Sequence, residues 1–234
     1  MIAPQSLLSR RTLLLSALAL GASACSREAD APASAPADEG EAAPPSPQAI
    51  GDLPVVALLG DSITAGYGLP AKDALPAQLE AALAAAGTPV RVRAAGVSGD
   101  TTAGALARVD FSIQDDTDLC VVALGGNDLL QGIEPATMRA NLEGIITRLK
   151  ARNIPVLLAG MQAPPSYGAY ATDFAAVFEG LARDHDVALY PFLLDGVALD
   201  PALNQDDGIH PNAAGVKVIA QRLAPAVAGA LAGA

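Results

Sequence analysis

The stretch that decides the fold of this chain is Val55-Val56-Ala57-Leu58-Leu59-Gly60-Asp61-Ser62-Ile63-Thr64. Its five leading apolar residues predict a strand buried on both faces. Gly60 then allows the chain to turn sharply, so Ser62 lies just past the carboxyl end of the strand. Ligands of open α/β sheets bind at this edge, which makes Ser62 a candidate nucleophile. The alternative is a simple turn, since Gly, Asp and Ser all favour turns.

Beyond this stretch, short apolar runs alternate with longer helical segments. Such alternation predicts a parallel sheet with right-handed crossovers and helices on both faces, a three-layer α/β sandwich. The expected strands are Val55–Leu59, Val90–Ala94, Leu119–Leu124, Val156–Ala159 and Val187–Tyr190, and the expected helices are Ala74–Ala86, Thr101–Val109, Pro135–Ala151, Thr172–Asp184 and Pro211–Leu231, with Pro135 and Pro211 at first helical positions.

Composition restricts the class of protein and of partner. The 234 residues suit one α/β domain over residues 51–234, preceded by other segments. The net charge of −11 repels phosphate backbones, so nucleic acid is not an expected partner. Of the two cysteines, Cys120 lies inside an apolar run and is expected to be a buried core thiol, so no disulfide framework is predicted.

Residues 1–24 have the pattern of an export signal. Arg10 and Arg11 form a basic region, and residues 12–20 form an apolar core that is too short to span a bilayer. The segment resembles a twin-arginine signal, with Leu15 where lysine is usual. We therefore expect the domain to be exported to the periplasmic side.

The export segment leads into Cys25, a candidate for lipidation. Ala22-Ser23-Ala24-Cys25 resembles a bacterial lipobox, although its first residue is usually leucine, and ordinary cleavage near Ala24 is the alternative. By resemblance to lipoprotein sorting, Ser26 favours the outer membrane. Residues 25–50 are rich in Ala, Pro, Ser, Asp and Glu and predict a disordered tether.

Two glycine-rich loops follow the second and third predicted strands. In Gly96-Val97-Ser98-Gly99-Asp100-Thr101, the glycines would let backbone N–H groups approach a ligand, and Asp100 or Thr101 would cap the next helix. In Gly125-Gly126-Asn127-Asp128, the Asn127 amide is a candidate donor to an oxyanion. The alternatives are a glycine-rich turn and a polar cap.

The chain has only two histidines. His185 falls at the expected end of a helix, where it suits a surface position near the negative end of the helix dipole. His210 precedes the last helix and follows Asp207 by three residues, so a tight turn brings a carboxylate to its imidazole. A zinc site is disfavoured by this poor ligand set, and a calcium or magnesium site at Asp206 and Asp207 has no further support.

In chain order, Gly60-Asp61-Ser62, Gly99, Gly125-Gly126-Asn127-Asp128 and Asp207-x-x-His210 resemble the blocks of the SGNH, or GDSL-type, hydrolase family. The resemblance covers about residues 54–225 and is strongest to its bacterial thioesterase I/lysophospholipase and arylesterase branch. It implies a flavodoxin-like fold with a five-stranded parallel sheet.

The resemblance also implies a serine hydrolase mechanism. Ser62 would attack an ester or thioester carbonyl, His210 would transfer the proton, and Asp207 would orient His210. The backbone N–H groups of Ser62 and Gly99 and the Asn127 side chain would bind the oxyanion. Neither a metal nor another cofactor is implied.

The expected substrate is a small acyl ester or thioester. The loops at 129–133 and 161–170 are apolar enough to line an acyl groove, or alternatively to pack as lids. The alternatives are a carbohydrate O-acyl esterase and a non-catalytic ligand-binding lipoprotein on the same fold. A membrane is the expected partner only through lipidated Cys25, and we expect a monomer.

Overall fold

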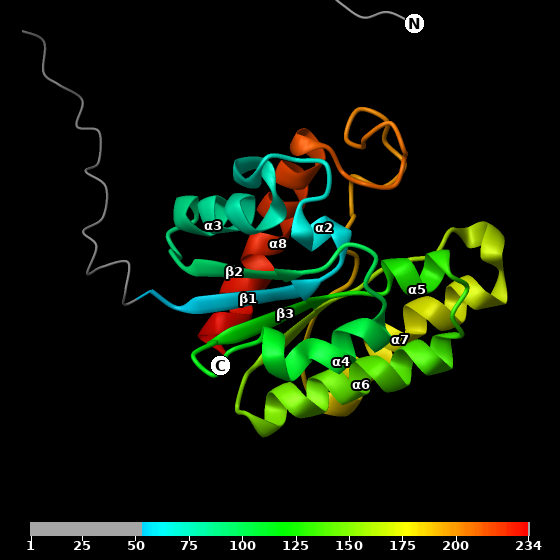
Figure 1. The fold of residues 1–234 in the computed structure, drawn as a ribbon, viewed down its shortest axis with the longest axis horizontal. Coiled ribbons are helices and arrows are strands. Elements are labelled where there is room, and N and C mark those ends of the chain that lie inside the picture. Colours follow the sequence, from blue (N-terminus) through cyan, green and yellow to red (C-terminus); the bar gives the residue numbers. More distant parts are fainter. Residues whose placement is uncertain (1–52, 234) are drawn as a thin grey trace, which may run out of the picture. The chain divides into compact units, whose positions relative to one another are not determined.

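A computed structural model describes residues 53–233, which contain one five-stranded parallel sheet (Figure 1). Its strand order is β2-β1-β3-β4-β5, and every neighbouring pair is parallel. The α/β class and the flavodoxin-like sheet predicted from the sequence are therefore confirmed. The strands are β1 (Val55–Gly60), β2 (Arg91–Gly96), β3 (Leu119–Ala123), β4 (Val156–Ala159) and β5 (Ala188–Tyr190).

The quoted stretch supplies β1, an inner strand of the sheet, and the start of α2. All six residues of β1 are buried, as are those of β3 and β4, whereas the edge strands β2 and β5 are partly exposed. Leu58 pairs with Ala94 on one side and with Val121 on the other. Burying each such leucine contributes roughly 1.5–3 kcal/mol, so the apolar run is what places β1 between two other strands.

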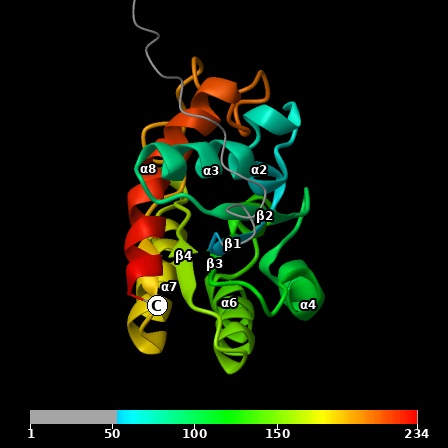
Figure 2. The ribbon, with the colours of Figure 1, turned by 90° about the vertical axis from the view of Figure 1, so that its left-hand side faces the viewer.

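Helices cover both faces of the sheet (Figures 1 and 2). Helices α3 and α8 pack together on one face, and α4, α6 and α7 form the layer on the other. The α-helices are α2 (Ser62–Ala65), α3 (Leu75–Ala85), α4 (Thr102–Ser112), α5 (Gly126–Leu130), α6 (Pro135–Ala151), α7 (Ala169–His185) and α8 (Ala213–Ala232), and two 3₁₀ turns are η1 (Ala71–Asp73) and η2 (Pro165–Tyr167).

The helix boundaries correct some expectations. Pro135 lies in the first turn of α6 as predicted, but Pro211 lies outside α8. Pro211 instead forms a β-bridge with Asn204, and Asn212 caps the helix by accepting from the N–H groups of its first turn. The short helices α2 and α5 were not expected, because their four and five residues are too few to show a helical period.

Cys120 lies in β3 and is fully buried, as predicted. Burial raises the pKa of its thiol to about 12, so it is an inert core residue. Within residues 53–233, no helix combines the length and apolar character needed to cross a bilayer. The predicted export segment 1–24, the tether 25–50 and Cys25 lie outside the described residues.

Candidate active site

Ser62 lies at the turn between β1 and α2. Asp61 caps α2, since its Oδ1 accepts from the Ile63 N–H at 3.1 Å, and Ser62 is the first helical residue. Gly60 makes the turn sterically allowed, because a Cβ there would lie 2.6 Å from the Ala123 carbonyl oxygen. The turn therefore places the Ser62 side chain at the carboxyl edge of the sheet, where the sequence predicted it.

The loop between β5 and α8 brings His210 to Ser62. His210 Nε2 lies 2.9 Å from Ser62 Oγ, and His210 Nδ1 lies 2.6 Å from Asp207 Oδ2. The other oxygen of Asp207 accepts from the N–H groups of Ile209 at 2.9 Å and His210 at 3.0 Å. These residues form one hydrogen-bonded chain from carboxylate to imidazole to hydroxyl.

Asp207 orients the imidazole from a partly exposed position. Its side chain is 38% exposed, compared with 20% for His210. Hydrogen bonds from the backbone and ring of His210 nevertheless lower the pKa of Asp207 to about 2, so it is ionised at neutral pH. Orientation of His210 therefore depends on the tight Asp-x-x-His turn rather than on exclusion of water.

Tyr67 packs against His210 and was not singled out from the sequence. The two ring centroids lie 4.5 Å apart at an interplanar angle of 35°. The Tyr67 N–H donates to the Ser62 carbonyl at 3.0 Å, and the Gln205 side chain donates to the carbonyls of both Tyr67 and Pro211. These contacts tie the turn of Ser62 to the loop of His210, and no sequence pattern indicated them.

Gly99, on the loop after β2, and Asn127, at the start of α5 after β3, line the same cavity as Ser62. Gly99 has φ +83°, which favours glycine. Asn127 lies in the first turn of α5, and its Nδ2 donates to the Asp100 carbonyl at 3.0 Å and more weakly to Asp61 Oδ2 at 3.5 Å. Thr101, rather than Asp100, caps α4.

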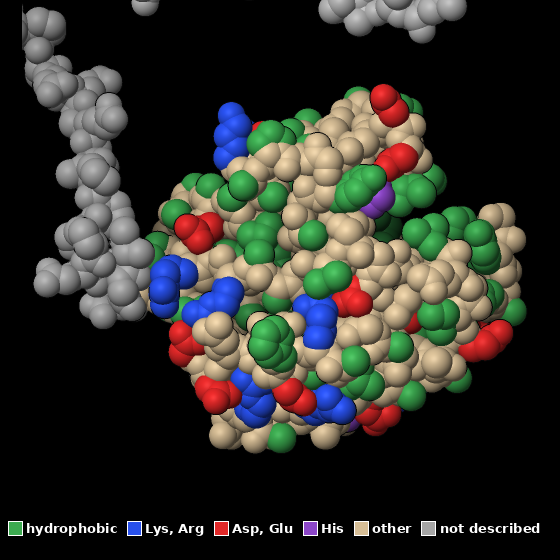
Figure 3. Space-filling model, in the orientation of Figure 1, with side chains coloured by type: hydrophobic (Ala, Val, Ile, Leu, Met, Phe, Trp, Pro, Cys, Tyr) green, Lys and Arg blue, Asp and Glu red, His purple; other side chains and the backbone are tan. Residues whose placement is uncertain are grey.

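The cavity that Ser62, Gly99, Asn127 and His210 line has a volume of about 460 Å³. Figure 3 shows hydrophobic side chains on both sides of a hollow at this end of the molecule. Both loops that the sequence indicated, 129–133 and 161–170, contribute to the lining. The cavity is lined by Asp61, Ser62, Ile63, Tyr67, Ser98, Gly99, Gly126, Asn127, Leu129, Leu130, Met161, Gln162, Pro164, Leu194, Ala198, Leu199, Asn204, Gly208, Ile209 and His210.

Asp61 is the carboxylate that lines this cavity, and it is nearly fully buried. Burial raises its pKa to about 6, although the Ile63 N–H and His210 act in the opposite direction. Near neutral pH the cavity therefore contains a buried negative charge beside Asn127.

Two other polar residues from the sequence analysis, His185 and Asp128, contact neighbouring helices and do not line the cavity. His185 ends α7, and its Nε2 lies 3.2 Å from Glu143 Oε1 on α6. Asp128 is fully buried and accepts from the backbone and side chain of Thr102 at 2.9 and 2.6 Å, which joins α5 to α4. Among residues 53–233, no three His, Cys, Asp or Glu side chains converge so that they could hold a metal ion.

The site has the components of nucleophilic acyl transfer. A serine hydroxyl within hydrogen-bonding distance of an imidazole can lose its proton to that ring as it attacks a carbonyl. N–H groups beside the serine can stabilise the negative oxygen that forms.

Comparisons with known proteins agree with this chemistry. The sequence pattern of the GDSL-like lipase/acylhydrolase family matches residues 58–218. Esterase TesA of Pseudomonas aeruginosa is 41% identical over 156 residues, which are 66% of this chain and 78% of that protein. Thioesterase 1/protease 1/lysophospholipase L1 of Escherichia coli K12 is 40% identical over 66% of this chain and 74% of that protein. The crystal structure of AlinE4, an SGNH-hydrolase family esterase, is similar with a TM-score of 0.64 and 46% identity, covering 76% of this chain and 97% of AlinE4.

Proposed function

Because this chain belongs to the GDSL-like lipase/acylhydrolase family and is a carboxylic ester hydrolase, we propose that Ser62, His210 and Asp207 form its catalytic triad. The observation that carries this proposal is the continuous hydrogen-bonded chain from Asp207 through His210 to Ser62. Ser62 also lines a mostly apolar cavity that can take an acyl group.

In the proposed reaction, Ser62 Oγ attacks the substrate carbonyl while its proton moves to His210 Nε2. The tetrahedral intermediate collapses to an acyl-enzyme as His210 gives that proton to the departing alkoxide or thiolate. A water molecule, deprotonated by His210, then attacks the acyl-enzyme carbonyl. The bond to Ser62 Oγ breaks, His210 returns the proton to Oγ, and the acid is released. Asp207 stabilises the imidazolium in both halves of the cycle without taking its proton.

The oxyanion would be bound by the backbone N–H groups of Ser62 and Gly99 and by Asn127 Nδ2. Asn127 supports this role because its amide is held by one good hydrogen bond, to the Asp100 carbonyl at 3.0 Å. Its 3.5 Å contact with Asp61 is at the limit of a hydrogen bond, so an N–H directed there remains available to a stronger acceptor.

The substrate class follows from the cavity. Leu129, Leu130, Met161 and Leu194 supply apolar surface for an acyl chain, and Tyr67 is the aromatic residue in the lining. This supports a small acyl ester or thioester over a sugar, because sugar-binding sites commonly use several aromatic faces. A chain-length series of p-nitrophenyl and thioester substrates would identify the preferred acyl group and leaving atom.

The triad is tested by substitution. Ser62→Ala and His210→Ala should each reduce turnover by at least ~10⁴-fold, and Asp207→Ala by at least ~10²-fold, with non-additive combinations. The smaller value for Asp207 fits its exposure, since water can partly replace the carboxylate. An organophosphonate should label Ser62 alone, as mass spectrometry of the adduct would show. Substantial turnover by folded Ser62→Ala would refute the assignment.

We further propose that the enzyme is exported and held at a membrane by lipid on Cys25. The support is the sequence alone: the Arg10-Arg11 signal and the lipobox-like residues before Cys25.

A further inference from the structure

Arg108, in the second half of α4, joins three segments of the chain. Its Nε donates to Asp100 Oδ2 at 2.7 Å, its Nη2 donates to the Gly60 carbonyl at 3.0 Å, and its Nη1 donates to Ser112 Oγ at 3.0 Å. The side chains of Arg108 and Asp100 are only 20% and 12% exposed. All three guanidinium nitrogens therefore have partners, and the ion pair is largely shielded from water.

Two of these partners flank the groups assigned to the oxyanion. Gly60 ends β1 and lies two residues before Ser62, and Asp100 directly follows Gly99. The guanidinium thus bridges the end of β1 and the loop after β2. The pairing between these two strands ends at Gly60 and Gly96, so Arg108 connects the segments where the strands no longer do.

Asp100 also connects this bridge to the third donor. Its carbonyl accepts from Asn127 Nδ2 at 3.0 Å while its carboxylate accepts from Arg108. Its carboxylate lies over Gly104 in the first turn of α4, where a Cβ would collide with it. Asp100 can therefore move only if both its contact with Arg108 and its contact with Asn127 change.

We propose that Arg108 is a positioning residue for the oxyanion hole, holding the Gly99–Asp100 segment at a set distance from the turn that carries Ser62. The inference rests on the proposed function, because the oxyanion hole that Arg108 would position is part of that proposal. Arg108 itself does not touch the substrate. It adds that the spacing of the three oxyanion donors is set by a residue outside the cavity.

The test is Arg108→Lys, which keeps the charge and most of the stem but loses the planar fork. A lysine ammonium cannot contact Asp100 and the Gly60 carbonyl in the same directions. Because displacement of a catalytic group by about 1 Å can cost ~10²-fold, we expect kcat to fall by ~10- to 100-fold. KM should change by less than about twofold, since the oxyanion exists only in the transition state.

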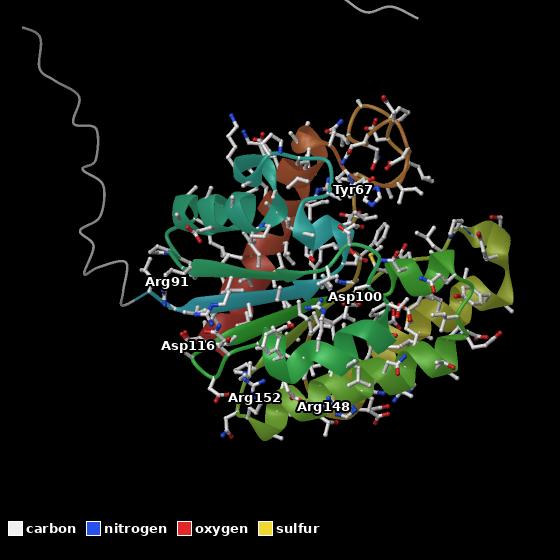
Figure 4. All side chains as sticks on the ribbon, in the orientation of Figure 1. Tyr67, Arg91, Asp100, Asp116, Arg148 and Arg152 are labelled. Atoms are coloured by element: carbon white, nitrogen blue, oxygen red, sulfur yellow. The ribbon has the colours of Figure 1, made fainter. Side chains whose placement is uncertain are left out.

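Arg152→Lys is the matched control. Arg152 also pairs with an aspartate, Asp115, and donates to a backbone carbonyl, that of Ile113, and its side chain is 22% exposed. It lies at the opposite end of the sheet from Asp100 (Figure 4). Asp115 is 88% exposed, so Arg152→Lys controls for the loss of the arginine fork and its carbonyl contact rather than for burial. It should leave kcat and KM within about twofold of wild type, so the exchange of arginine for lysine by itself cannot account for a selective effect of Arg108→Lys.

A second readout separates positioning from a structural role. An alkyl boronic acid forms a tetrahedral anion on the serine, so its Ki should rise in Arg108→Lys in proportion to the fall in kcat. Binding of a primary alcohol with the same alkyl chain, which has neither a carbonyl nor an anionic oxygen, should not change. Wild-type kcat and boronate Ki in Arg108→Lys would overturn the inference.

If Arg108→Lys does not fold, Asp100→Asn replaces it, because it weakens the same ion pair while keeping the carbonyl that Asn127 needs. It should show the same parallel change in kcat and boronate Ki, and unchanged values would overturn the inference. Ser62→Ala distinguishes the two proposals: an active Ser62→Ala protein removes the proposed function, whereas an inactive one beside a fully active Arg108→Lys removes only the inference.

Discussion

Asn127 has a single carboxamide nitrogen that faces two acceptors at unequal distances. The Asp100 carbonyl holds it at 3.0 Å and the Asp61 carboxylate approaches only to 3.5 Å. This asymmetry orients the side chain in the free enzyme and leaves one N–H weakly engaged. An oxyanion that forms beside Ser62 would compete for that N–H as a strong, charged acceptor.

Asn127→Ala should therefore lower kcat by ~10²–10³-fold with little change in KM, as expected for one lost oxyanion donor. Asn127→Asp should be at least as damaging, because it loses the donor and adds a charge next to Asp61. Asn141→Ala is the control, since that amide donates at 3.1 Å to Thr102 Oγ1 and does not line the cavity. Near-wild-type turnover in Asn127→Asp would remove Asn127 from the proposed oxyanion hole.

Asp61 links the site to stability. Burial raises its pKa to about 6 from an ordinary value of 3.8, so the folded state takes up a proton more readily than the unfolded chain does. Between roughly pH 4 and pH 6 the native protein binds more protons at this residue, and its contribution to stability must fall as pH rises. Above this range the folded protein carries a buried, poorly solvated carboxylate.

Asp61→Asn tests the predicted fall in stability as pH rises. Asparagine keeps an acceptor for the Ile63 N–H and cannot ionise, so the variant should gain stability relative to wild type as pH rises from 4 to 7. Two pKa units correspond to about 2–3 kcal/mol in the difference between their free energies of unfolding. Urea unfolding at several pH values would measure it, with Asp173→Asn, at an exposed site on α7, as the control. A pH-independent difference would contradict the burial argument.

The loop that carries His210 is held by the residue that caps the following helix, α8. Asn212 caps α8 through Oδ1, which accepts from Ala214 and Gly215 at 3.0 Å. Its Nδ2 donates back to the carbonyls of Ala202 and Asn204. One side chain thus begins the last helix and closes the loop that brings His210 to Ser62.

Asn212→Ala should destabilise the protein by about 1–3 kcal/mol, from the lost cap and the two unsatisfied carbonyls. Asn212→Asp should keep the cap and lose only the donors, so its loss of stability should be smaller. Denaturant unfolding of wild type, Asn212→Ala and Asn212→Asp would rank their free energies of unfolding. A kcat measured at a denaturant concentration well below the unfolding midpoint would show whether His210 stays in place. Equal stability of all three would mean that the cap contributes nothing.

The molecule as a whole gathers its polar loops at one edge of the sheet. Parallel strands all end at the same edge, so the loops after β1, β2 and β3 and the segment before α8 meet around a single cavity. The described residues begin at Leu53, directly before β1, and therefore at the opposite, amino edge of the sheet, and the proposed anchor at Cys25 precedes them in the sequence. Attachment and catalysis would therefore use opposite ends of the strands.

Cys25→Ser tests whether the proposed anchor holds the enzyme at a membrane without affecting catalysis. Wild type should partition into the membrane and detergent fractions, because stable anchoring requires two or more acyl chains. The variant should appear in the aqueous fraction with an unchanged kcat for a water-soluble ester. Wild-type protein cleaved near Ala24 would contradict the anchor and leave the enzyme assignment intact.

Local patterns in the sequence were enough to predict the layers of the fold and the positions of the candidate residues. Apolar runs such as Val55–Leu59 predict a strand that is buried on both faces, and glycines at strand ends indicate where the chain turns. The tight Asp207-x-x-His210 turn is likewise local, so its hydrogen bonds could be foreseen. Those features depend on residues within a few positions of one another.

Only the tertiary structure showed how distant segments are held together. Tyr67 packs on His210, and Arg108 reaches the Gly60 carbonyl, across separations in sequence that carry no periodic signal. The raised pKa of Asp61 and the exposure of Asp207 also follow from packing, because solvation depends on what the rest of the chain covers. Local conformation is set by neighbouring residues, whereas distances between loops, burial and electrostatics are set by the packed whole.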